Sequence, residues 1–229
     1  MKIIDLTLEM KDGMSFHPSH PPLQLVEQST FENSRHRYIS PCEGFESRKI
    51  LMSDHSGTHI DAPLHFIKEG PSASEMNLDR TIGQAVVLDV SPYKKTDEPV
   101  TLEMLQKAEL KQKINWSSIQ ILLLKTTKCV WGTDEYFKTE SLAEEVIPWI
   151  LDKNLKLLGI DLGNIDCDSN MKRSVHLSLL SNDIYIVENL VNLESLLPYE
   201  DIVFVGTPLK IRNATGSPIR AFAMVGDAE

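Results

Sequence analysis

The chain has 229 residues, a formal net charge of −10 at pH 7, and 41% hydrophobic and 24% charged residues. This acidic balance, with scattered Lys and Arg, argues against a nucleic-acid partner, and no apolar run approaches the roughly 20 residues of a membrane span. Acidic residues appear too early in the N-terminal segment for a signal peptide. We therefore expect a cytoplasmic protein with one domain over residues 1–229, no membrane association and a small-molecule substrate.

Apolar runs that predict buried strands alternate with fewer helical patterns along the chain. The strand candidates are KIIDLTL, residues 84–90, 119–127 and 155–161, and then DIYIV, DIVFVG and IRAFAMV. The helix candidates are TLEMLQKAELK after Pro99, SLAEEVIPWILDKN with a capping-box pair at Ser141 and Glu144, and a short helix around His176. This order predicts an α/β fold with a mixed, strand-rich sheet that is covered on at least one face.

The stretch DHSGTHIDAPLHF, at residues 54–66, concentrates groups that can bind a metal. Gly57 and Pro63 make a helix unlikely there, and on an extended backbone alternate side chains point the same way. The side chains that share this face are those of His55, His59, Asp61 and His65. An unbent strand would hold His55 and His65 about 33 Å apart, so we expect bends at Gly57 and Pro63. Imidazoles and a carboxylate with room for water suit zinc or manganese.

A purely structural role for these four groups is the competing interpretation. Without a metal, each buried group would have to find its own partner, at a cost of about 1 to 3 kcal/mol for each one left unsatisfied. The sequence therefore favours a metal site.

The same residues carry a resemblance to a known family. The pattern His-x-Gly-Thr-His-x-Asp-x-Pro-x-His resembles the signature of the putative cyclase superfamily of metal-dependent hydrolases, which includes bacterial kynurenine formamidases and isatin hydrolases. The blocks LLGID, IVENLVNLESL and GTPLKIRNATGSPIRAFAMV resemble later blocks of that family. The resemblance implies a swivelling β/β/α domain, a homodimer or homotetramer, and one or two divalent ions per chain, zinc or alternatively manganese.

The resemblance also implies roles for individual residues. A first ion would be held by His55, His59 and Asp61, and Asp61 would bridge to a second ion held also by His176 and Glu188. His65 would act as the catalytic base. Apart from the resemblance, Glu188 follows the apolar run IYIV, where a buried carboxylate needs a cation or hydrogen-bond donors. His176 alone would be interpreted as a helix residue.

These parts predict hydrolysis of an amide by metal-activated water, with His65 moving the proton. The expected substrate is an aryl formamide such as N-formylkynurenine, or a cyclic amide or imide. The alternatives are a metal-dependent cyclase or dehydratase without net hydrolysis, and a non-catalytic metal-binding module.

The residues that would hold the substrate are less defined. Kynurenine formamidases usually carry a Trp-Pro-Gly-like stretch near the N-terminus, where this chain has MSFHPSHPP. Phe16 is a candidate substitute for the aromatic contact, and Phe66 is a second candidate. His17 and His20 either line the pocket or belong to an exposed N-terminal segment that the prolines fix. The sequence favours the exposed segment.

Overall fold

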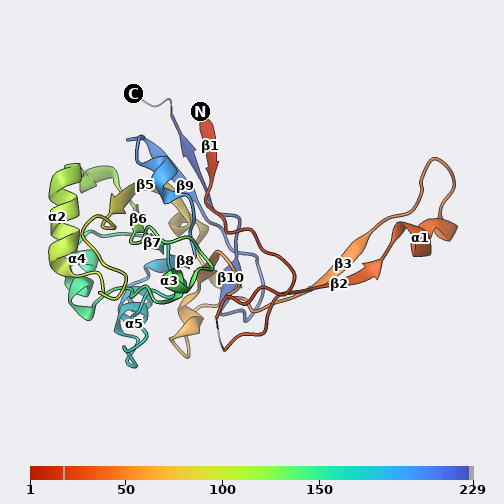
Figure 1. The fold of residues 1–229 in the computed structure, drawn as a ribbon, viewed down its shortest axis with the longest axis horizontal. Helices are drawn as coiled ribbons and strands as arrows, with labels where there is room; N and C mark the ends of the chain where they lie inside the picture. The colour runs from red at the N-terminus through yellow and green to blue at the C-terminus, as the bar shows by residue number, and fades with distance from the viewer. Residues whose placement is uncertain (18, 227–229) are drawn as a thin grey trace.

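A mixed sheet organises the molecule, which we describe from a computed structural model over residues 1–17 and 19–226. Within these residues, nine strands pair in the order β1-β11-β9-β5-β6-β7-β8-β4-β10 (Figure 1). The strands are β1 (Lys2–Asp5), β4 (His59–Asp61), β5 (Ile82–Asp89), β6 (Ile121–Lys125), β7 (Leu157–Ile160), β8 (Tyr185–Glu188), β9 (Ile202–Val205), β10 (Gly216–Pro218) and β11 (Phe222–Val225). The sheet is strongly curled, and its central strands β5 to β8 run parallel.

The central strands are buried on both faces, as their unbroken apolar runs predict. On β6, Ile121 and Leu123 point into the inner hydrophobic cluster, on one face of the curled sheet. Ile60 and Phe204 belong to the same cluster. Leu122 and Leu124 point to the opposite face and pack in a second cluster under the helices. A short β6 can therefore hold the two halves of the core together.

The outer face of the sheet is covered by α2 (Leu102–Gln112), α4 (Ile147–Asp152) and α5 (Ser174–Ser181), which lie together on the left in Figure 1. A single turn, α3 (Asp134–Phe137), follows β6. This confirms the expected α/β fold and the helices after Pro99 and around His176. Among residues 1–17 and 19–226, no helix combines the length and the apolarity needed to cross a bilayer.

The expected helix start at Ser141 is wrong. The Ser141 hydroxyl donates to the carbonyl oxygen of Ile165 at 2.8 Å instead of capping a helix. A 3-10 turn at Glu144–Val146 comes first, and α4 begins at Ile147 with Pro148 in its first turn, where a proline is tolerated. The contact with Ile165 lies far along the sequence, so no local pattern could show it.

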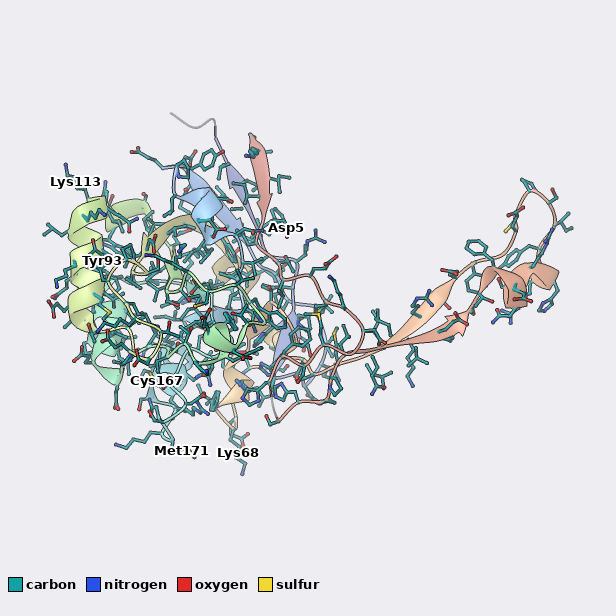
Figure 2. The ribbon with its side chains drawn as sticks, in the orientation of Figure 1. Asp5, Lys68, Tyr93, Lys113, Cys167 and Met171 are labelled. Atoms are coloured by element: carbon teal, nitrogen blue, oxygen red, sulfur yellow. The ribbon has the colours of Figure 1, made fainter. Side chains whose placement is uncertain are left out.

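A long hairpin projects from the body of the molecule and forms the arm, residues 24–51 (Figure 1). Its strands β2 (Gln24–Ser29) and β3 (Ser47–Leu51) pair only with each other, and α1 (Phe31–Ser34) lies at the tip. Figure 2 shows the side chains of the arm extending away from the rest of the molecule. The strand patterns singled out in the sequence did not include this hairpin, because its side chains are exposed on both faces.

Candidate functional site

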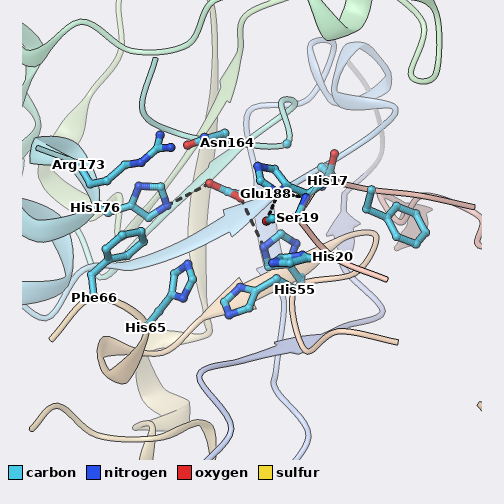
Figure 3. A pocket seen from close by; sticks show the side chains of 14 residues that line it. His17, Ser19, His20, His55, His65, Phe66, Asn164, Arg173, His176 and Glu188 are labelled. Carbon is cyan, nitrogen blue, oxygen red and sulfur yellow. Dashed lines mark hydrogen bonds and ion pairs between the residues drawn. The ribbon is translucent and has the colours of Figure 1, made fainter. Parts of the chain in front are cut away.

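Six of the seven histidines of the chain line one cavity of about 170 Å³ beside β4 and β8 (Figure 3). The register of these antiparallel strands sets His59 opposite Glu188. Gly57 has a φ of +63°, and Pro63 opens a 3-10 turn that ends at His65. The two expected bends are therefore present, and they bring His55 and His65 from either side of β4 into contact.

Asp61 lies at the centre of the cluster and is fully buried. Neither of its carboxylate oxygens has a hydrogen-bond partner among the described residues. Oδ1 lies 2.8 Å from Nδ1 of His55, which also lacks a hydrogen bond, and Oδ2 lies 3.6 Å from Nε2 of His176. A buried carboxylate without partners is costly, and lone pairs that converge in this way are typical of a cation site.

Glu188 lies between two histidines. Its Oε2 is 3.4 Å from Nε2 of His59, and its Oε1 is 3.4 Å from Nε2 of His176. A tetrahedral ion with ligand distances of about 2.0 to 2.2 Å holds its ligand atoms roughly 3.3 to 3.6 Å apart. The spacing of these nitrogen and oxygen atoms therefore fits a bound divalent ion with little rearrangement.

Hydrogen bonds outside the cluster fix the tautomer of three histidines. Nδ1 of His59 faces the carbonyl oxygen of Gly57 at 2.9 Å, and Nδ1 of His176 faces Asp166 at 2.6 Å. Both partners can only accept, so each Nδ1 carries the proton. Nε2 of His55 lies 2.9 Å from the Thr215 hydroxyl, whose own proton goes to Asp54. In all three rings the other nitrogen faces the carboxylates, which is the arrangement of metal-binding histidines.

The pKa values of the buried histidines and of Glu188 show that the cluster favours positive charge beside its carboxylates. Burial lowers the pKa of His59, but Glu188 and Asp61 outweigh it and raise that pKa to about 9. Burial also opposes the charge on His176, whose pKa the carboxylates of Asp166, Asp61 and Glu188 raise well above its usual value. Burial raises the pKa of Glu188, yet the two imidazoles lower it to about 2. Without a metal, protonated imidazoles balance the carboxylates, and a divalent ion would replace those protons.

His65 differs from the other three histidines. Its ring stacks on His55 with centroids 3.9 Å apart, and it meets Phe66 edge-on at 4.3 Å. No described group is hydrogen-bonded to either ring nitrogen. Burial lowers the pKa of His65 to about 4, so the ring is neutral at pH 7. A ring nitrogen of His65 lies within 4.8 Å of possible metal-ligand atoms of His55 and Asp61. A second group of ligand atoms at the same spacing comes from His59, Asp61 and Glu188.

Two aromatic side chains contribute to the lining of the cavity. Phe16 and Phe66, the two candidate substrate contacts, both line it. Phe16 packs on Trp131, with centroids 5.8 Å apart, and Phe66 packs on His176 at 4.5 Å. His17 and His20 line the same cavity. The structure therefore supports the interpretation that these two histidines line the pocket, and not that they belong to an exposed segment.

Asn189 connects Trp131 and Tyr136 to the histidine cluster. Its Oδ1 accepts hydrogen bonds from Trp131 and Tyr136, and its Nδ2 donates to the carbonyl oxygen of Gly57 at 3.1 Å. That carbonyl also accepts from His59. Trp131 and Tyr136 were not predicted from the sequence, because the segment after β6, where Tyr136 lies on α3, carries no motif.

A second, larger cavity adjoins the first. It measures about 580 Å³ and shares Phe16, His17, Gly163 and Asn164 with the cavity that holds the histidines. Tyr136 and Phe137 add aromatic surface to its lining. A molecule that places one group among the histidines therefore has room for a longer portion here.

Comparison with known proteins gives a consistent family. The family model described as putative cyclase matches residues 4–167. A kynurenine formamidase of Bacillus thuringiensis is 31% identical over 173 residues, which is 76% of this chain and 77% of the relative. A kynurenine formamidase of Bacillus cytotoxicus is 28% identical over 220 residues, or 95% of each chain.

Solved structures share the fold. Isatin hydrolase A from Labrenzia aggregata, bound to benzyl benzoate, superposes with a TM-score of 0.80 at 24% identity, over 99% of this chain and 94% of the other. A predicted metal-dependent hydrolase from Bacillus stearothermophilus superposes with a TM-score of 0.71 at 24% identity, over 97% of each chain.

Proposed function

This chain belongs to the putative cyclase family, and we propose on that premise that it is an enzyme of metal-dependent amide hydrolysis acting on an aryl formamide such as N-formylkynurenine. The observation that carries the proposal is the buried Asp61, whose two unpartnered oxygens face histidines with fixed tautomers. The kynurenine formamidase relatives support a formamide, and a cyclic amide or imide is the second substrate class to test.

The cation would be divalent, zinc or alternatively manganese, because the donors are imidazole nitrogens and carboxylate oxygens. We assign one ion to His55, His59 and Asp61, and a second ion to Asp61, His176 and Glu188. When bound, such ions activate water and polarise the substrate carbonyl. The hydrogen bonds of Gly57, Thr215 and Asp166 keep the three imidazoles turned toward the carboxylates, where the ions would bind.

His65 is the catalytic base in this proposal. Each of the other three cluster histidines has its remaining ring nitrogen tied by a hydrogen bond, whereas His65 has no such tie among the described residues. A neutral imidazole can accept a proton from the attacking water and return it to the departing aryl nitrogen. Cleavage of the carbon–nitrogen bond then gives formate and an aryl amine.

The aromatic portion of the substrate would rest against Phe16 and Phe66. Both rings line the cavity beside the histidines, and Trp131 packs against Phe16. The adjoining 580 Å³ cavity gives room for a substituent on the aryl ring.

A substrate panel tests the reaction directly. We expect the purified, metal-loaded protein to release formate from formanilide and its substituted relatives, measured together with the aryl amine product. Cyclic imides serve as the second class, for which hydrolysis gives a ring-opened acid. Conversion of a panel compound with loss of water, without formate or an opened acid, would instead indicate a cyclase or dehydratase. A protein that binds metal but converts none of the panel would favour the non-catalytic module.

We further propose that the chain forms a homo-oligomer in which a second copy covers the arm. An isolated two-stranded hairpin is marginally stable in water, and this one carries exposed apolar side chains on both faces and at its tip. These are Leu25, Val26, Phe31, Tyr38, Ile39, Ile50 and Leu51. Such a surface suits a symmetric interface with another copy of the chain. The cytoplasmic location expected from the sequence stays a prediction.

Light scattering after size-exclusion chromatography tests this assembly. We expect a mass at least twice the 25.8 kDa of one chain. Leu25 and Ile50 face each other across the hairpin, so the double substitution Leu25→Asp and Ile50→Asp should lower the measured mass. Leu110→Asp is the control, because Leu110 is 80% exposed on α2, away from the arm. A wild-type protein of 25.8 kDa at micromolar concentration would contradict the proposal.

A further inference from the structure

Arg173 is a cation in the histidine-lined cavity that the reaction described above does not use. It immediately precedes α5, three residues before His176. Figure 3 shows its guanidinium on the same side of the cavity as Asn164, with His17 and His20 on the other side of Glu188. No sequence motif singles out this residue, because a lone arginine before a helix is common.

The guanidinium of Arg173 has an unmet hydrogen-bonding requirement. Its Nη1 is buried and has no hydrogen-bond partner among the described residues. No described carboxylate lies within 4.0 Å of it to form an ion pair. A guanidinium can only donate, so a metal ion cannot satisfy this nitrogen, and an acceptor must come from elsewhere.

The nearby carboxylates have other partners. Asp166 accepts from the backbone nitrogens of Val175 and His176, from the His176 ring and from Asn170. Asp61 and Glu188 face the histidines of the cluster. The described residues therefore offer Arg173 no anion, and bound divalent ions would make the cavity more positive.

The local backbone holds Arg173 in place at a cost. Its φ of 50° and ψ of 44° lie in the left-handed region, which residues other than glycine rarely adopt. Residues kept in this region often serve a functional site. Beside it, Oδ1 of Asn164 accepts from the backbone of Asp166, and no described group accepts from its Nδ2. Arg173 and Asn164 thus present free donors to the same cavity.

We propose that Arg173 binds a carboxylate on the substrate, so that the preferred substrate is an aryl amide carrying a carboxylate away from the bond that is cleaved. This inference rests on the proposed amide hydrolysis and assigns Arg173 to specificity. A planar carboxylate matches the two parallel donors of a guanidinium, and the charge strengthens both hydrogen bonds. Asn164 can supply a third donor.

The test compares 2-, 3- and 4-formamidobenzoate with their methyl esters. For the wild-type enzyme we expect KM for the best carboxylate to be at least about 10-fold lower than for its ester. Arg173→Gln should raise the KM for that carboxylate by about 10- to 100-fold with a small effect on kcat, and should leave the ester unchanged. Arg173→Lys should restore part of the preference. Lys172→Gln is the control, because Lys172 is an exposed neighbouring cation.

A binding experiment separates this inference from the proposed reaction. Quenching or anisotropy of 2-aminobenzoate fluorescence gives its Kd, with aniline as the uncharged competitor, and requires no turnover. We expect Arg173→Gln to weaken 2-aminobenzoate at least about 10-fold while circular dichroism shows an intact fold. If no formamide is cleaved but this difference is present, the reaction is wrong and the anion site is right. Two results would overturn the inference. One is equal affinity of the wild type and Arg173→Gln for 2-aminobenzoate, and the other is an equal preference of both proteins for the carboxylate over its methyl ester.

Discussion

Removal of divalent ions by a chelator should abolish amide hydrolysis, and adding zinc or manganese should restore it. Metal-activated water is the proposed nucleophile, so the reaction should stop when the ions are removed. The expected loss is the whole catalytic effect of the centre, on the order of 10⁶-fold or more for a typical enzyme. Metal content by mass spectrometry should be measured on the same samples as formate release. Full turnover by a protein shown to be metal-free would sink the mechanism.

Substitutions of the ligands should lower the metal content in parallel. Glu188→Gln and His176→Ala each remove a proposed ligand of the second ion, so we expect the content to fall from about two ions toward one per chain. His36→Ala is a matched control, because His36 is exposed near the tip of the arm. If both ligand variants still hold two ions, the assignment of Glu188 and His176 is wrong.

His65→Ala should lower kcat by about 10²- to 10⁴-fold while the metal content stays near that of the wild type. The physical reason is that His65 would move the proton, whereas the other histidines would hold the ions. The geometry makes this a sharp test, because the ring lies close enough to His55 and Asp61 to join them as a ligand. Loss of an ion together with activity would identify His65 as a ligand.

The pH dependence gives a second measurement on the same variant. Burial lowers the pKa of His65 from about 6.5 to about 4, so the ring is neutral and able to accept a proton at any pH well above 4. As the pH falls through 4, protonation should remove the base and lower kcat. The acidic limb should therefore lie near 4, and it should disappear in His65→Ala. A limb near 6.5 in metal-saturated wild type would contradict the buried environment.

The central strands of the sheet could be predicted because they are buried on both faces, so that consecutive residues are apolar. Leu122 and Leu124 face the helices, and Ile121 and Leu123 face the inner core, so β6 appears as an unbroken apolar run. The arm could not be recognised in the same way, since side chains on both of its faces are exposed. A fold pattern is visible in a sequence only where burial repeats regularly.

The candidate site divides along a similar line. His59 and Asp61 lie two residues apart on β4, so their common direction follows from strand geometry. His176 and Glu188 come from other parts of the chain, and only the family resemblance could join them to β4. Arg173 and Trp131 depend on loops that the sequence does not place. Which groups share a cavity is set by tertiary contacts over more than a hundred residues.

The position of β4 in the sheet has a consequence for the order of assembly during synthesis. β4 is paired on one side with β8 and on the other with β10, so its neighbours are made more than 120 and 150 residues later. A nascent chain that ends before Tyr185 carries the histidine motif of residues 55–65 but has neither strand to hold it. The proposed metal ligands on β4 are thus synthesised well before those on α5 and β8. Because the contacts of β4 join residues far apart in the sequence, the metal centre should form late in folding.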